Sequence, residues 1–193
     1  RPVSRYMPAS KMVLVEQTAN LGGGAIWPLE TLDAVIEEAK SQGLVVHMDG
    51  ARLLNAVAKT GVSPKRYARD VDTVWIDFSK GLGAPRGAVL AGSVDFCRQA
   101  WRQKQGLGGA MRQSGVLAAA CLYALDNHIE QQSIDNDLAA SIGQRIVKLS
   151  RVANMLPVAT NIIVFDVVSD APTAAEIVER LKGRGVLLGA FGE

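Results

Sequence analysis

Two stretches decide the fold that the sequence predicts: HMDGARLLNA, residues 47–56, and WIDFSKGLGAPRG, residues 75–87. A short apolar run leads into the polar residues of each stretch, and we interpret each run as a buried strand. In a parallel α/β sheet, the residues at the carboxyl ends of the strands line the ligand crevice. An acid, Asp49, and an amine, Lys80, are therefore expected to face one shared site.

An acid and an amine at one site are the pair that pyridoxal phosphate chemistry needs. A lysine forms a Schiff base with the aldehyde of this cofactor, and an acid lies against its pyridine nitrogen. We interpret Lys80 as that lysine and Asp49 as that acid. Two structural alternatives stay open, because a lysine after a strand is usually solvated and Asp49 could cap the helix that begins at Ala51 or Arg52. The glycines and proline after Lys80 favour the cofactor site, since their sharp turn lets the backbone approach a ligand.

Four motifs, in order and in spacing, resemble the low-specificity L-threonine aldolases, a branch of the fold-type I pyridoxal phosphate enzymes. The motifs cover nearly the whole chain and are VEQTANLGGGAIWPLETLDAV (15–35), HMDGARLLNAVAKTGV (47–62), DFSKGLGAPRGAVLAGS (77–93) and GLGGAMRQSGVLAAACLYAL (106–125). The resemblance implies retro-aldol cleavage of L-threonine, L-allo-threonine and related β-hydroxy-α-amino acids to glycine and an aldehyde. It also implies a homo-oligomer, a dimer or tetramer, with shared active sites.

The resemblance assigns roles to further residues. Arg52 is expected to bind the substrate carboxylate, because a planar guanidinium suits a carboxylate, and Ser79 and Thr18 are expected near the cofactor. Arg112 follows a glycine turn at the start of a predicted helix, where anions are favoured, and in the family this arginine reaches the cofactor phosphate of the neighbouring subunit. Tyr6 aligns with a family histidine near the β-hydroxyl, so the general base stays unassigned.

Two other functions remain open. One is a pyridoxal phosphate-dependent β-eliminating lyase, which breaks the bond from Cβ to its substituent and yields pyruvate and ammonia. The other is a fragment that is inactive on its own. The chain begins at Arg1 without a methionine and ends just after an apolar run, so we expect an internal fragment that lacks both ends.

The expected fold is α/β, a mostly parallel sheet with flanking helices of the fold-type I, transferase-like kind, plus part of a small α/β domain. Residues 1–129 are expected to form the central part of the cofactor-binding domain, and residues 130–193 an incomplete C-terminal domain with its connecting helix. Strands in the main sheet are predicted at 12–16, 44–48, 73–78 and 87–91. The last strand is expected to be antiparallel, because its connection is short.

The helices follow from apolar spacing and from end signals. They are predicted from about 32 to the C-capping Gly43, at 52–59, from Pro64 after Ser63, from Ser93, at 113–127, from 134 onward and at 173–182. In the small domain, strands are predicted at 160–168 and 186–188. The glycine run 22–24 could cradle phosphate, but no lysine follows at P-loop spacing, so a flexible crossover loop is the favoured interpretation.

The composition excludes several classes of partner. Lys and Arg number 21 against 19 acids, a net charge of +2 without a basic run, so neither nucleic acid nor a membrane is indicated. Cys97 and Cys121 lack metal-type spacing and predict reduced core residues of a cytoplasmic protein. The longest apolar run, 116–125, is about half of the ~20 residues that span a bilayer.

Neither histidine is expected to be the acid–base group. We interpret His47 as a hydrogen-bonded core residue, and His128 as a helix-terminal residue whose cation would suit the helix dipole. Asn161, at the start of a predicted strand, is expected to be structural. No metal site is predicted.

Overall fold

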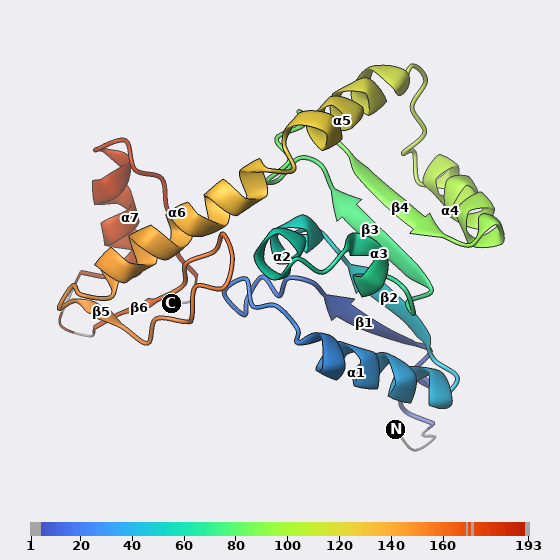
Figure 1. The fold of residues 1–193 in the computed structure, drawn as a ribbon, viewed down its shortest axis with the longest axis horizontal. Coiled ribbons are helices and arrows are strands. Elements are labelled where there is room, and N and C mark those ends of the chain that lie inside the picture. The colour runs from blue at the N-terminus through green and yellow to red at the C-terminus, as the bar shows by residue number, and fades with distance from the viewer. Residues whose placement is uncertain (1–4, 169, 171, 192–193) are drawn as a thin grey trace.

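The computed structural model describes residues 5–168, 170 and 172–191 of the chain. Its main sheet has the order β1-β2-β3-β4 (Figure 1) and consists of β1 (Met12–Glu16), β2 (Val45–Asp49), β3 (Thr73–Asp77) and β4 (Ala88–Gly92). The first three strands are parallel, and β4 runs antiparallel to β3. The four predicted strands and the reversed direction of the last one are confirmed, with boundaries that differ by at most one residue.

The helices begin and end close to their sequence signals. They are α1 (Leu29–Ser41), α2 (Leu53–Thr60), α3 (Pro64–Tyr67), α4 (Val94–Gly106), α5 (Gly115–Asn127), α6 (Gln131–Ile146) and α7 (Ala174–Lys182). Ser63 caps α3 by accepting a hydrogen bond from the Arg66 N–H, with Pro64 at the first helical position. Gly43, at φ 67°, follows the end of α1. Both end signals are confirmed.

The main core lies between one face of the sheet and the helices α1, α2 and α3. Its fully buried members come from both layers and are Val15, Leu32, Ile36, Ala39, Val46, Met48, Leu53, Ala56 and Tyr67. Side chains alternate between the two faces along a strand. Because Val46 and Met48 point into this core, Asp49 at the end of β2 points to the opposite face, away from these helices.

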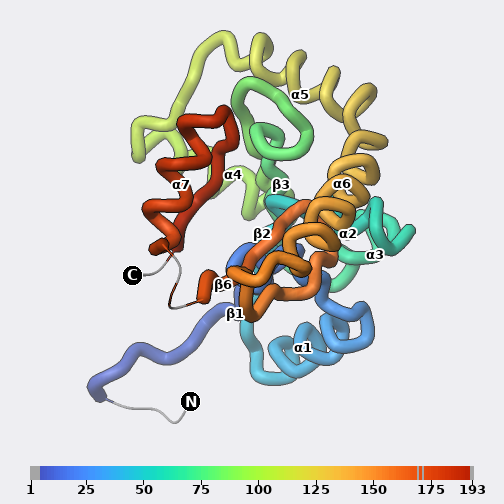
Figure 2. Tube along the Cα trace, turned by 90° about the vertical axis from the view of Figure 1, so that its left-hand side faces the viewer, coloured from blue at the N-terminus to red at the C-terminus, as the bar shows by residue number. Residues whose placement is uncertain are grey.

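Helix α6 leads away from the main sheet to a second, smaller group of elements (Figure 1). This group faces the viewer in Figure 2. This group contains α7 and an antiparallel pair formed by β5 (Val152–Ala153) and β6 (Asp166–Val167). The strand predicted at 160–168 is therefore wrong except for β6, and the strand predicted at 186–188 is absent from this described segment. A short apolar run forms a strand only where a partner strand completes its ladder, and the sequence cannot supply that information. The domain boundary after residue 129 stays a prediction.

The glycine run 22–24 is packed, which corrects the interpretation of a flexible loop. Gly23 and Gly24 are buried, and the hydroxyl of Thr160 donates a hydrogen bond of 2.8 Å to the carbonyl of Gly24. A Cβ atom on Gly24 would overlap that hydroxyl oxygen, and one on Gly23 would press on Leu156. The glycines therefore let the segment after α6 dock against the loop after β1.

Replacing Gly24 should reveal this close approach. Gly24 and Gly43 both have positive φ, at 75° and 67°, but only Gly24 has neighbours at its Cβ position. Gly43→Ala should cost about 1–2 kcal/mol from backbone strain alone, whereas Gly24→Ala should cost about 2–5 kcal/mol because overpacking adds to the strain. Chemical denaturation of the full-length protein measures both values. Equal costs would contradict a docked glycine loop.

Candidate functional site

A fixed turn carries Lys80 out from the end of β3. Phe78, Leu82 and Ala84 are buried in a second apolar cluster beside α5, while Lys80 itself is exposed. The N–H of Gly83 donates to the carbonyl of Lys80 at 2.9 Å, and the N–H of Ala84 donates to the carbonyl of Phe78 at 2.8 Å. Gly83 has φ 68°, a conformation that favours glycine. The sequence thus folds into a closed turn that presents one lysine.

Asp49 and Lys80 approach the same face of the sheet. Lys80 Nζ lies 3.4 Å from Asp77 Oδ2 and 5.5 Å from the centre of the Trp75 ring. Trp75 is the register partner of Asp49 on the neighbouring parallel strand, and the Gly50 N–H donates to the Trp75 carbonyl at 3.0 Å. Register partners in adjacent strands point to one face. The predicted acid and the predicted amine are therefore expected on one face of the sheet, where Trp75 is the register partner of Asp49 and its ring contacts Lys80.

Asp77 is a charged member of this group that sequence analysis missed. The Ser79 hydroxyl and the Ser79 N–H both donate to Asp77 Oδ1, at 2.6 and 2.8 Å. Partial burial pushes the pKa of Asp77 upward, but the Ser79 hydrogen bonds and Lys80 together hold that pKa below its ordinary value. Its position three residues before Lys80 was the available signal. Asp77 is ionised and pairs with Lys80 in this structure.

Asp49 is not the N-cap of α2, so that alternative is wrong. The cap residue is Arg52, and Asp49 Oδ1 instead accepts a hydrogen bond of 3.0 Å from the Ala51 N–H. Such a bond two residues along the chain forms a local turn before the helix. Arg52 extends toward the loop after β1, where its Nη1 donates to Asn20 Oδ1 at 3.1 Å. The carboxylate of Asp49 therefore stays near the strand end.

The end of β1 contributes two buried polar atoms without a partner. Thr18 and Gln17 are 1% and 0% exposed, and Thr18 Oγ1 and Gln17 Nε2 form no hydrogen bond within the described chain. A buried polar atom left unbonded is costly, so such atoms indicate a missing partner. An orphaned hydroxyl, an acid and an amine at one sheet edge fit the polar groups of pyridoxal phosphate.

The structure supports the predicted roles of three further residues less directly. Ser79 lies beside Lys80 and is exposed, and its hydroxyl donates to Asp77. Arg112 lies in the exposed turn before α5 and forms no hydrogen bond or ion pair with residues 5–168, 170 or 172–191. Tyr6 is 78% exposed near the start of the chain, where its hydroxyl and its ring contact Arg5. The roles of these three residues stay predictions.

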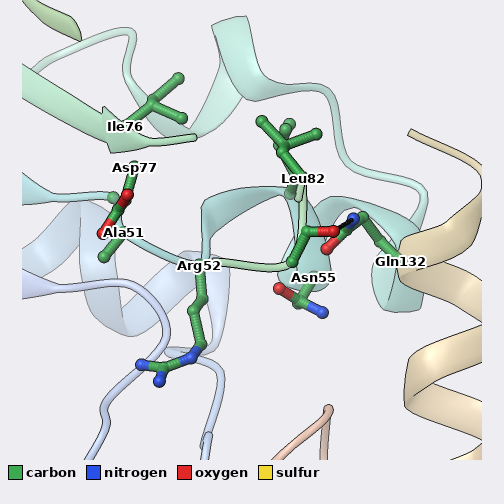
Figure 3. Close-up of a pocket in the computed structure, with 10 residues that line it drawn as sticks. Ala51, Arg52, Asn55, Ile76, Asp77, Leu82 and Gln132 are labelled. Carbon is green, nitrogen blue, oxygen red and sulfur yellow. Dashed lines mark hydrogen bonds between the residues drawn. The ribbon is translucent and has the colours of Figure 1, made fainter. Parts of the chain in front are cut away.

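A small pocket lies between the β2–α2 loop and the Lys80 turn (Figure 3). Its lining residues are Gly50, Ala51, Arg52, Leu54, Asn55, Ile76, Asp77, Gly81, Leu82 and Gln132. The cavity has a volume of about 10 Å³, far below the roughly 300–1,000 Å³ of common ligand pockets. Gln132 reaches this pocket from α6, and nothing in its local sequence predicts that contact.

The two histidines have hydrogen-bond partners. His47 Nδ1 is 2.7 Å from Thr73 Oγ1 on the neighbouring strand, which confirms the predicted hydrogen bond, but His47 is half-buried and belongs to neither apolar cluster. His128 ends α5, and its Nδ1–H donates to the carbonyl of Leu82 at 2.7 Å, a contact that the sequence did not predict. Within the described residues, no group of three or more His, Cys, Asp or Glu could hold a metal ion. No helix of that part of the chain is long and apolar enough to span a membrane.

Removing the Ser79 hydroxyl should raise the pKa of Asp77 toward its ordinary value, because one of its donors is lost. A lowered pKa stabilises the folded state above the ordinary Asp value of about 3.9, and that stabilisation is lost as pH falls through the folded value. Ser79→Ala should therefore lose less stability in acid than the wild-type protein. Carbon-13 NMR titration of the Asp77 carboxyl measures the pKa, with Ser93→Ala, at the cap of α4, as control. An unchanged Asp77 pKa in Ser79→Ala would rule out the hydroxyl as its cause.

Known proteins share both the sequence and the fold. The "Probable low-specificity L-threonine aldolase 2" of Arabidopsis thaliana is 39% identical over 185 residues, which cover 95% of this chain and 52% of the relative. The low specificity L-threonine aldolase of Escherichia coli strain K12 is 35% identical over 190 residues, covering 98% of this chain and 55% of the relative. The chain thus spans about half the length of the curated relatives it matches.

The fold is that of a solved threonine aldolase. The threonine aldolase of Leishmania major superposes with a TM-score of 0.72 over 94% of this chain and 52% of that chain, at 19% identity, which shows the fold alone. The expected fold-type I, mostly parallel α/β architecture and the resemblance to L-threonine aldolases are both confirmed. The sequence profile of the family described as beta-eliminating lyase matches residues 1–170. The chain belongs to the beta-eliminating lyase family.

Proposed function

We propose that the full-length protein is a pyridoxal phosphate-dependent aldolase that cleaves L-threonine, L-allo-threonine and related β-hydroxy-α-amino acids to glycine and an aldehyde. The observation that carries the proposal is the common face of Asp49 and Lys80, with the Lys80 amine 5.5 Å from the ring of Trp75. When bound, pyridoxal phosphate supplies a ring that accepts electrons from Cα as the Cα–Cβ bond breaks.

The proposed cofactor site uses the residues at the strand ends. Lys80 holds the cofactor covalently through Nζ, and the Asp49 carboxylate holds a proton on the pyridine nitrogen, because an opposite charge nearby favours the charged form. The orphaned Thr18 hydroxyl and the Ser79 hydroxyl supply hydrogen bonds. Arg112 binds the phosphate group of the cofactor held by the neighbouring subunit, in a dimer or tetramer. Its exposure and its lack of an acidic partner in the described chain support this role.

The proposed substrate site lies beside the cofactor. Arg52 binds the substrate carboxylate through its planar guanidinium. Its hydrogen-bond partner here, Asn20, is a neutral amide, so the charge of Arg52 is not compensated by this contact. Tyr6 is assigned to the neighbourhood of the β-hydroxyl on the resemblance alone, and the general base is not assigned. We also propose that the protein is cytoplasmic.

A β-eliminating lyase is the second candidate, and the family's description favours it. That enzyme would use the same amine and acid but release pyruvate and ammonia instead of glycine and an aldehyde. A third outcome, that this stretch is inactive when isolated, is supported by its coverage of about half of its curated relatives. The experiments below therefore use the full-length protein.

Product analysis with and without the lysine tests the function. The full-length protein incubated with L-threonine should form glycine and acetaldehyde in equal amounts. Lys80→Ala should lose both the absorbance of the lysine–cofactor bond and all cleavage, because the amine is the covalent anchor. Lys104→Ala, which removes an exposed lysine of α4, is the control and should keep both. Ammonia and 2-oxobutyrate, the 2-oxoacid that β-elimination forms from L-threonine, would instead establish the β-eliminating lyase. A persistent band in Lys80→Ala would move the anchor to another lysine.

Asp49→Asn should reduce cleavage while leaving the fold and much of the cofactor binding intact. Asparagine can form a hydrogen bond to the ring nitrogen but cannot supply the charge that holds its proton. Since that charge matters along the reaction path, kcat should fall on the order of 10²-fold with little change in KM. Steady-state kinetics measure both constants, with Asp95→Asn on the exposed surface of α4 as control. A variant that kept its kcat and lost only substrate affinity would make Asp49 a binding residue.

A further inference from the structure

Two side chains from the junction of α5 and α6 hold the turn that carries Lys80. Gln132 Nε2 donates a hydrogen bond of 2.8 Å to the carbonyl of Gly81, and His128 Nδ1 donates one of 2.7 Å to the carbonyl of Leu82. These carbonyls belong to the two residues that directly follow Lys80. The backbone next to the lysine is therefore bound to the helix pair.

Gln132 fits closely against Gly81. A Cβ atom on Gly81 would overlap Gln132 Oε1, although Gly81 does not have a positive φ. The glycine is thus explained by the approach of the glutamine amide rather than by its backbone conformation. Gln132 is 1% exposed, and its Nε2 also donates to the carbonyl of His128 at 3.1 Å. With these two acceptors, the buried amide is fixed in one orientation.

The same face of α6 also holds the element that follows Asp49. Asn136 lies one helical turn after Gln132 and is buried against Asn55 of α2. Asn55 Nδ2 donates to Asn136 Oδ1 at 3.2 Å, and Asn136 Nδ2 donates to the Asn55 carbonyl at 3.0 Å. In Figure 3, Gln132 and Asn55 lie beside each other at the pocket. Helix α6 therefore fixes α2 and the Lys80 turn relative to each other.

We propose that Gln132 is a positioning residue for Lys80. Its amide sets the Gly81 peptide, and this peptide sets the point from which the Lys80 amine reaches out. The proposal rests on the proposed function of Lys80 as the cofactor anchor. Lys80 Nζ contacts Asp77 and the Trp75 ring, both on the strand that leads into the turn. The amine keeps these contacts only while the turn holds the Lys80 backbone at its present distance from the strand. A displacement of about 1 Å at a reacting group costs on the order of 10²-fold in rate.

Hydrogen exchange in the cofactor-free, full-length protein tests the tether itself. Gln132→Met keeps a side chain of similar length but cannot donate to Gly81. The amides of Gly83 and Ala84, which close the turn, should exchange about tenfold faster in this variant, the effect of one lost hydrogen bond. Gln131→Met is the matched control, because Gln131 is exposed and bonds Asp135 instead. Its exchange should equal that of the wild-type protein.

Spectroscopy and kinetics of the holoenzyme then test the positioning role. In Gln132→Met, the pH midpoint of the absorbance band from the lysine–cofactor bond should shift, and kcat should fall on the order of 10²-fold with KM within about threefold. Gln131→Met should change none of these. If Gln132→Met lowers only the melting temperature and leaves exchange, midpoint and kcat unchanged, Gln132 is merely structural and the proposal is overturned.

A second variant and the wild-type absorbance band separate failure of the Gln132 proposal from failure of the proposed function. If Gln132→Met does not fold, Gln132→Leu decides, because its apolar side chain has no hydrogen-bond donor. The same shifts are expected in Gln132→Leu, and unshifted values in that folded variant overturn the proposal. Absence of the band in the wild-type protein contradicts the proposed function as a whole. A normal wild-type band beside an unaffected Gln132→Met contradicts only the role of Gln132.

Discussion

The hydrogen bond from Gln132 to the Gly81 carbonyl joins the two parts of this chain. On one side of it lies the strand-ending turn with Lys80, and on the other lies α6, which leads to every later element. Apolar contacts tolerate sliding, whereas a buried amide loses about 1–3 kcal/mol when its partner moves away. The pair Asn55–Asn136 adds a second polar contact on the same helix face. These polar contacts hold α6 in one position beside the carboxyl ends of the strands. The position of the Lys80 turn depends on that of α6.

The main sheet was predictable because its signals are local. Each strand is a short apolar run, and helices begin at residues such as Ser63 and end near glycines such as Gly43, which act within a few positions. The chain after α6 was less predictable, since the apolar runs at 160–168 and 186–188 resemble strands but largely lack partner strands. Strand pairing depends on residues far apart in the sequence, so a single apolar run does not show whether a partner strand exists.

In the candidate site, too, the local features were predictable and the long-range contacts were not. The shared face of Asp49 and Lys80 follows from two strand ends and the parallel direction of β2 and β3, which the sequence pattern indicated. The contact of Gln132 with Gly81 spans 51 positions, and that of Thr160 with Gly24 spans 136. In both cases the glycine is visible in the sequence, but the distant side chain that approaches it is not, and only the fold identifies that side chain.

Aldol cleavage and β-elimination place the same demand on these residues. Both reactions need electrons withdrawn from Cα, and in the proposed function the amine of Lys80 and the charge of Asp49 would serve that need in either case. The reactions differ in the bonds that break. Aldol cleavage removes the β-hydroxyl proton and breaks Cα–Cβ, whereas β-elimination removes the Cα proton and releases the substituent of Cβ. Arg52 and Asp77 line the described pocket, and Tyr6 does not. In the proposed function the strand-end residues would therefore serve the step that both reactions share, while the choice between the reactions belongs to the groups that take the β-hydroxyl proton or the Cα proton.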